Sequence, residues 1–320
     1  MLVFGRRFLQ ARDKYIIPLI SYSVPENKLE FNNIKYALLN FIKYTRVTGS
    51  RYELYFEKDS LLKALVGDIE YFYTKTIVQY CNLLRAQNNL SACWRIVTQY
   101  YFSFFSVTTL LRFLHRGHTY LDGDQAKRIS DILTLFSEHG LTVIKRGNYK
   151  FYIEQTTNPD ELCLVLIQSD TSHDQTWNLV SEVLSELLAD STRDDEYTIL
   201  MTLKKIINCY QYNFPSTLRN QVNYQAKYGL ESIKNQLQFY KITDLGFDEV
   251  VNQLLLFDNK TDENYKLKIS GLYGYYFFAL ISKFYSEYIT RSRSSNSLDR
   301  IRKEYLKRYG VFIPDFPDSI

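Results

Sequence analysis

Cysteine, glycine and proline are scarce in this chain, and their scarcity excludes several kinds of site. The 320 residues include only 4 Cys, which are far apart and form no Cys-x-x-Cys pair, so neither a zinc site nor a disulfide framework is predicted. No Gly-x-Gly-x-x-Gly, Gly-x4-Gly-Lys-Ser/Thr or Gly-x-Ser-x-Gly sequence occurs. The usual nucleotide-binding loops and the hydrolase nucleophile elbow are therefore absent.

Long hydrophobic runs are also missing. No window approaches about 18 uncharged apolar residues, so we predict no membrane-spanning helix and expect no membrane partner. Residues 1–15 carry early charges without a long apolar run or a small-residue cleavage site, so no signal peptide is predicted. Dispersed cysteines suit a reducing compartment, and together these absences favour a cytoplasmic protein.

The acidic residues lack the arrangement of a metal site. Asp122 and Asp124 belong to a turn-forming stretch. For these aspartates, and for the second acidic group at residues 194–196, no other acid completes a calcium or magnesium pattern. We therefore predict no metal and no other cofactor.

Aromatic residues are the most distinctive part of the composition, with 28 Tyr and 21 Phe. Stacking surfaces for nucleic acid are one explanation. Core packing is the other, and the helical spacing of these residues favours it. The net charge of +4 is too small to indicate a nucleic-acid partner by itself.

The chain is centred on residues 91–118, a stretch without proline in which apolar side chains recur at helical spacing on nearly every side. A helix of this kind is buried. We predict one continuous helix over residues 91–116, packed against helices at residues 176–189, 218–239 and 272–288. Further helices are predicted at residues 33–44, 59–86, 125–136 and 197–212.

Residues 141–168 change to a strand pattern, with short segments rich in β-branched and aromatic residues separated by turn-forming dipeptides. They predict two or three antiparallel strands, inserted as a small sheet into a helical bundle. The fold class is thus mainly α. The predicted domains are a helical N-terminal extension over residues 1–88, the bundle with its strands over residues 89–290, and a basic C-terminal tail over residues 291–320.

Two motifs of this bundle resemble the HEPN family, the four-helix domains of prokaryotic toxins, immunity systems and nucleotidyltransferase partners. Tyr100-Tyr101-Phe-Ser-Phe104-Phe105, followed by small residues and leucines, resembles the aromatic run of the family's first core helix. Leu218-Arg219-Asn220-Gln-Val-Asn223-Tyr224 resembles the Arg-containing start of a later helix. The resemblance covers residues 91–290 and implies a HEPN-like helical bundle with a β insertion.

The chain departs from the family's catalytic pattern. Nuclease members carry a His about five positions after the Arg, where it acts as acid, base or orienter, but Tyr224 stands here instead. A Tyr with its reference pKa near ~10 is a poor general base at neutral pH. The resemblance therefore implies a phosphate or RNA pocket more readily than an active ribonuclease. Its residues are Arg219, Asn220, Asn223, Tyr224 and Lys227.

The predicted start of a helix before Arg219 is a second reason to expect an anion site here. Ser216 and Thr217 can cap a helix whose first turn holds Arg219, and a helix N-terminus with free N–H groups attracts anions. The alternative is an ordinary cap followed by a surface arginine.

Two other basic groups are candidate binding sites. The first has a loose Arg-x5-His pattern at the end of the central helix, where favourable interaction with the helix dipole is the alternative explanation. The second is the tail, with seven basic and two acidic residues, for which a solvated segment or a docked helix are the alternatives. The first group is Arg112, His115, Arg116 and His118, and the second is Arg291, Arg293, Arg300, Arg302, Lys303, Lys307 and Arg308.

These features predict a HEPN-like component of a prokaryotic defence or toxin-type system. It would bind RNA or a nucleotide-bearing partner near Arg219 with little or no catalysis, and any catalysis would be that of a metal-independent ribonuclease. Protein partners of the same system are expected, and a homo-oligomer is left open. The competing interpretation is a non-enzymatic scaffold subunit whose aromatic faces serve assembly.

Overall fold

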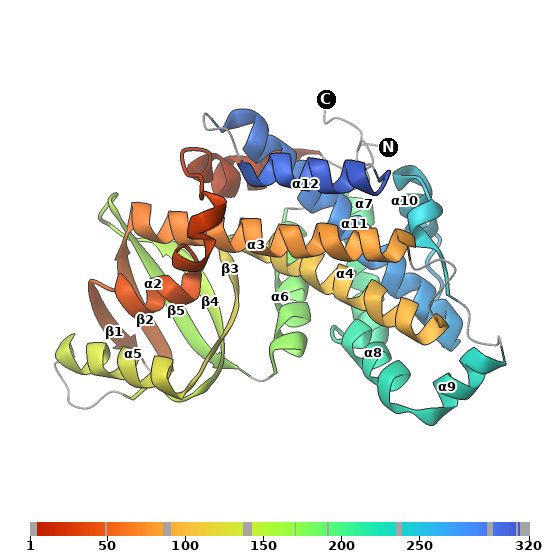
Figure 1. Cartoon of the computed structure of the whole chain (residues 1–320), viewed down its shortest axis with the longest axis horizontal. Coiled ribbons are helices and arrows are strands. Elements are labelled where there is room, and N and C mark those ends of the chain that lie inside the picture. Colours follow the sequence, from red (N-terminus) through yellow and green to blue (C-terminus); the bar gives the residue numbers. More distant parts are fainter. Residues whose placement is uncertain are drawn as a thin grey trace.

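The computed structural model describes residues 5–48, 50–85, 91–136, 143–169, 171–190, 192–234, 239–292, 297–311 and 313. The chain is mainly helical (Figure 1). Its α-helices are α1 (Arg6–Ala11), α2 (Ile34–Asn40), α3 (Lys58–Arg85), α4 (Ala92–Phe113), α5 (Gly123–Phe136), α6 (Ser172–Leu187), α7 (Asp195–Tyr210), α8 (Phe214–Tyr224), α9 (Ala226–Ile233), α10 (Phe247–Leu255), α11 (Glu263–Arg291) and α12 (Ser297–Arg308). Short π- or 3-10-helical segments are η1 (Arg12–Ile16), η2 (Ile17–Leu19), η3 (Glu26–Phe31) and η4 (Ile242–Asp244).

One antiparallel sheet lies at the end of the molecule opposite α8 and α9 (Figure 1). Its strand order is β1-β2-β5-β4-β3. β5 is central, and its buried Leu164 lies opposite Leu54 of β2 and Ile153 of β4. The strands are β1 (Tyr44–Thr48), β2 (Arg51–Glu57), β3 (Arg116–Leu121), β4 (Gly147–Gln155) and β5 (Glu161–Ser169).

The sheet confirms the antiparallel strands predicted within residues 141–168, but it is larger than predicted. β4 and β5 account for that region; residues 143–146 are not in a strand, and residues 141 and 142 lie outside the described part. β1 and β2 come from residues 44–57, which were included in a helical extension. Their alternation of aromatic or β-branched with polar residues has the period of a strand, which the helical interpretation overlooked.

The central helix α4 is buried as predicted, but it ends at Phe113, before the predicted end at residue 116. His115 has a left-handed backbone conformation with φ 58°, and it turns the chain into β3, where a helix end and a turn were predicted. α4 packs against α6, α8 and α11, as predicted, and most extensively against α3 and α11. Tyr101 and Phe105 are only partly buried, so their side of α4 faces outward.

The helix predicted over residues 218–239 is divided. α8 ends at Tyr224, and Gln225 has extended backbone angles, φ −98° and ψ 120°, before α9 begins. Residues 235–238 lie outside the described part of the chain. α8 is therefore a short helix, and it brings Arg219 against α4.

Much of the predicted basic tail is the docked helix α12, which lies along α3 (Figure 1). Leu298 and Leu306 are buried. Arg302 is buried as well, with Nη2 at 2.6 Å from Oε2 of Glu70 and Nη1 at 2.8 Å from Oγ1 of Thr74. Arg302 therefore contributes to packing. A nucleic-acid-binding tail would require it to be free, and it is not.

Three other cations of this segment are also paired. Arg291, Arg300 and Lys303 each form an ion pair one helical turn away, with Glu287, Glu304 and Asp299. Lys307 and Arg308 are exposed, and Arg293 lies outside the described residues. In the part of the chain that is described, no helix combines the length and the apolar content that crossing a bilayer requires.

Candidate phosphate-binding site

Five arginine side chains are buried in the described part of the chain, and four of them have a carboxylate partner. The four pairs, with N–O distances of 2.6–2.8 Å, are Arg7–Asp194, Arg112–Asp68, Arg116–Glu186 and Arg302–Glu70. The fifth, Arg219, is 9% exposed and has no carboxylate at ion-pair distance among the described residues. Because a buried charge without a counter-ion is unfavourable, Arg219 is the side chain that most needs an anion.

Arg219 lies against the aromatic residues of α4. Its guanidinium carbon is 5.1 Å from the ring centre of Tyr100 and 5.7 Å from that of Tyr101, within cation–π range. Its Nε is buried without a hydrogen-bond partner. These contacts bring together the two motifs that carry the HEPN resemblance, Tyr100-Tyr101 on α4 and Arg219 on α8.

His173, from the first turn of α6, completes the cluster. Its Nδ1 lies 2.7 Å from the hydroxyl oxygen of Tyr100. Its ring centre is 4.5 Å from that of Phe104 and 6.4 Å from that of Tyr101. The sequence places a Tyr where the family has its His, but in space a histidine from another helix stands beside Arg219 and Tyr100.

The surroundings of His173 determine its charge. Burial raises the pKa of Tyr100 to about 12, so its hydroxyl keeps its proton at neutral pH. Burial, and then the charge of Arg219, lower the pKa of His173, so its ring is neutral. The hydroxyl of Tyr100 and Nδ1 of His173 therefore share one hydrogen bond between two neutral groups, and its direction depends on which ring nitrogen of His173 carries the hydrogen.

This arrangement is suited to holding an oxyanion. Arg219 offers a planar charged donor, and the neutral imidazole of His173 adds a polar group beside it. A histidine whose pKa is lowered, and whose Nδ1 is engaged by the hydroxyl of Tyr100, is a weaker base than a free imidazole. The cluster therefore favours binding over acid–base catalysis.

Helix α8 begins one turn earlier than the predicted cap. It starts at Phe214, with Pro215 in its first turn, where a missing N–H costs nothing. Ser216 is therefore buried inside the helix, and Arg219 lies in the second turn. The anion site predicted at a free helix N-terminus is accordingly replaced by a site on the side of the helix.

The other residues predicted for this pocket are not buried with Arg219. Asn220 and Asn223 are exposed, and Tyr224 is 79% exposed. The Nζ of Lys227 lies 3.0 Å from Oε2 of Glu263, so its charge is already matched. Of the five residues, Arg219 alone belongs to the buried cluster.

The second predicted basic group does not form one patch. Arg112 and His118 line a cavity beside α3, whereas His115 and Arg116 line another one next to Tyr15. Besides binding Asp68, Arg112 donates hydrogen bonds to the carbonyl oxygens of Arg116 and His118. Both arginines therefore fix the turn between α4 and β3.

The two histidines of this group predict a pH dependence of stability. Burial lowers the pKa of His115 to about 4 and that of His118 to about 3, below the value of about 6.5 expected in the unfolded chain. As the pH falls below about 6.5, the unfolded chain binds the protons first, and each histidine removes up to about 1.4 kcal/mol of stability per pH unit down to its folded pKa.

We expect His118→Asn to flatten the loss of stability between pH 7 and pH 4. The asparagine amide can replace Nδ1, which lies 2.8 Å from Oγ1 of Thr176. Urea unfolding at several pH values measures the slope, and the exposed variant Lys307→Asn is the control. A wild-type slope in His118→Asn would show that His118 is not held neutral by the fold.

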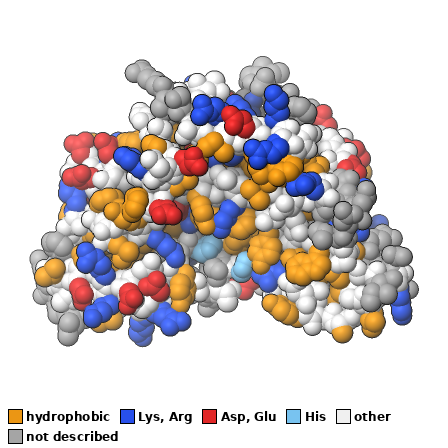
Figure 2. Space-filling model, viewed as in Figure 1, with side chains coloured by type: hydrophobic (Ala, Val, Ile, Leu, Met, Phe, Trp, Pro, Cys, Tyr) orange, Lys and Arg blue, Asp and Glu red, His pale blue; other side chains and the backbone are white. Residues whose placement is uncertain are grey.

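The cavity beside α3 adjoins the Arg219 cluster. It has a volume of about 620 Å³ and lies between α3, the η3–α2 segment and β3. The Nζ of Lys75 on α3 is 4.4 Å from the ring centre of Tyr71, in the cavity wall, and 5.1 Å from that of Phe105 on α4. Figure 2 shows this face hollowed at its centre, with histidine, basic and hydrophobic side chains around the hollow.

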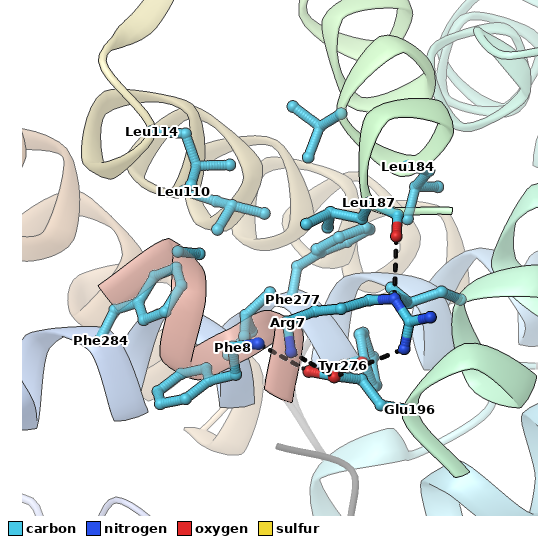
Figure 3. A pocket seen from close by; sticks show the side chains of 14 residues that line it. Arg7, Phe8, Leu110, Leu114, Leu184, Leu187, Glu196, Tyr276, Phe277 and Phe284 are labelled. Carbon is cyan, nitrogen blue, oxygen red and sulfur yellow. Dashed lines mark hydrogen bonds and ion pairs between the residues drawn. The ribbon is translucent and has the colours of Figure 1, made fainter. Parts of the chain in front are cut away.

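A different cavity, drawn in Figure 3, lies where helix α1 packs against the bundle. It is lined mainly by apolar side chains of α1, α4, α6 and α11 and has about 40 Å³, room for no more than a few water molecules. At its edge, Glu196 accepts hydrogen bonds from the backbone N–H groups of Arg7 and Phe8 at 2.8 Å. We assign it to packing and not to ligand binding.

The residues predicted from the sequence do not include His173 or Lys75. His173 could have been found, because it is one of only 4 His and lies one helical turn before Trp177 of the helix predicted at residues 176–189. Nothing in the sequence separates Lys75 from the other lysines. Within the described residues, no group of three or more His, Cys, Asp or Glu side chains is placed to hold a metal ion.

No family model, curated protein or solved structure matches this chain. The HEPN resemblance thus depends on the two motifs, and a function has to be inferred from the geometry around Arg219.

Proposed function

We propose that this chain binds single-stranded RNA and holds one of its phosphate groups at Arg219. The observation that carries this proposal is that Arg219 is buried without a carboxylate, while the four other buried arginines are paired. A phosphate would supply the missing negative charge and accept hydrogen bonds from the guanidinium fork.

The surroundings of Arg219 favour RNA over a free anion. Tyr101 and Phe105 are partly exposed aromatic rings next to it, their centres 6.1 Å apart, and Lys75 lies against Phe105. Rows of aromatic rings with interspersed cations are the usual surface for single strands, since bases stack on the rings and phosphates lie near the cations.

The biological setting follows from the resemblance to the HEPN family. We propose a HEPN-like component of a prokaryotic defence or toxin-type system that recognises RNA without cleaving it. The neutral His173, with Nδ1 engaged by Tyr100, supports binding without cleavage. The protein alone is expected to leave a labelled RNA intact during prolonged incubation without metal.

Arg219→Met is expected to weaken the binding of single-stranded RNA by about 10- to 100-fold, because one charge-assisted contact worth about 1.5–3 kcal/mol is lost. The slope of log affinity against log salt should fall by about 0.7, the effect of one phosphate contact on a single strand. Fluorescence anisotropy of a labelled oligoribonucleotide at two salt concentrations measures both. The free energy of unfolding should not decrease, since an unpaired buried charge is removed.

Arg300→Met is the matched control, because it removes the same charge from a side chain that is 77% exposed on α12. It should change RNA affinity by less than about twofold. If Arg219→Met binds RNA as the wild type does, the proposal fails. If the wild type binds no RNA, the scaffold interpretation takes its place.

A further inference from the structure

The cavity beside α3 is large enough for a base. Its volume of about 620 Å³ is within the range of about 300–1,000 Å³ for small-molecule sites. Tyr71, Phe72 and Tyr120 contribute aromatic rings to its wall. Tyr71 and Tyr120 are 46% and 38% exposed, so these large apolar side chains are left uncovered at the surface of the cavity.

The charges at this cavity are divided between paired and unpaired groups. Asp68 and Arg112 neutralise each other deep in the wall, and Glu30 is exposed at the rim. Lys35 is exposed and Lys75 partly exposed, and neither has a carboxylate at ion-pair distance among the described residues. The cavity thus offers aromatic surface with two available cations, which suits a nucleotide better than an uncharged apolar ligand.

A continuous series of contacts joins this cavity to Arg219. Tyr71 contacts Lys75, Lys75 contacts Phe105, and Phe105 packs on Tyr101, which lies against Arg219. Tyr101 and Phe105 are one turn apart on α4, so the series follows the outward side of that helix. A single strand lying along it would meet aromatic rings with cations between and beside them.

We infer that the cavity beside α3 holds a base of the same RNA strand whose phosphate is bound at Arg219, with the base stacked on Tyr71 and the adjoining phosphates near Lys75 and Lys35. This inference rests on the proposed function and adds the base to it. Sequence preference would then arise in the cavity, and Arg219 would contribute affinity for any sequence.

Tyr71→Ala tests the inference, with an octamer of single-stranded RNA and an abasic octamer of the same backbone as probes. Loss of one stacked base should weaken binding of the RNA about tenfold or more, and Tyr71→Phe should keep wild-type affinity because the ring remains. The abasic octamer should bind Tyr71→Ala and the wild type equally. Tyr44→Ala, which truncates a tyrosine of similar exposure, 40%, outside this cavity, is the control.

The outcomes separate this inference from the proposed function. If Arg219→Met weakens RNA binding but Tyr71→Ala does not, the cavity holds no base and the phosphate site stands. If Tyr71→Ala weakens the abasic octamer as much as the RNA, the stacking interpretation is wrong. If neither variant changes binding of either probe, both proposals fall together.

Discussion

Replacing Arg302 with methionine is expected to lower the free energy of unfolding by about 3–5 kcal/mol, the cost of leaving one member of a buried ion pair alone. Glu70 is fully buried, and the guanidinium of Arg302 provides its ion pair as well as a hydrogen bond to the hydroxyl of Tyr285. Without the arginine, the Glu70 carboxylate would remain in the core without its counter-charge. Urea unfolding at pH 7 measures the difference.

Two further variants show whether the buried charge is the cause. Arg300→Met removes a charge from the exposed side of α12 and should change stability by less than about 0.5 kcal/mol. Glu70→Gln combined with Arg302→Met removes the unpaired charge while keeping a polar partner for Tyr285, and it should recover part of the loss. If Arg302→Met and Arg300→Met have equal free energies of unfolding, the Arg302–Glu70 ion pair does not contribute to the core as described.

Gly274→Ala is expected to destabilise the protein by about 3 kcal/mol, the upper part of the range for overpacking. α11 crosses α4 so closely that a Cβ at Gly274 would lie 1.7 Å from Oγ and 2.4 Å from Cβ of Ser103. The two helices would have to separate, and α4 carries Tyr100 and Tyr101. RNA affinity should therefore fall together with the melting temperature.

Gly229→Ala is the matched control for this substitution. Gly229 lies within α9, and a Cβ there would meet no atom within 4 Å, so alanine should stabilise the helix by up to about 1 kcal/mol. Adding Ser103→Gly to Gly274→Ala removes the clashing atoms and should restore part of the stability. If Gly274→Ala leaves the free energy of unfolding unchanged, α4 and α11 can move apart without cost.

Periodicity was sufficient to predict α4 as a buried helix, because its apolar residues cover nearly every side. β1 and β2 show the period of a strand but were included in the helical extension, and the partners β5 of β2 and β4 of β3 lie farther along the chain. The outward side of α4 was also missed. Tyr101 and Phe105 continue the apolar spacing of the core, and only the position of α3 and α6 leaves them partly exposed.

Only one residue of the predicted pocket, Arg219, belongs to the buried cluster of the candidate site. Arg219 stood out through its motif, but a sequence does not reveal which arginines find a carboxylate. The acids that pair with Arg112, Arg116 and Arg302 lie 44, 70 and 232 positions away, so the sequence around each arginine does not identify its partner. The arginine left unpaired is recognised only when all these long-range pairs are known.

Because 232 positions separate Glu70 from Arg302, the ribosome synthesises Glu70 long before the arginine that neutralises it. A ribosome adds about 5–20 residues per second, so the interval between the synthesis of Glu70 and that of Arg302 is on the order of 10–50 s. Until α12 emerges, the nascent chain carries an uncompensated carboxylate in the middle of α3, its longest early helix. The core is therefore completed only after α12 has been synthesised, and products released before residue 302 should be targets for proteolysis.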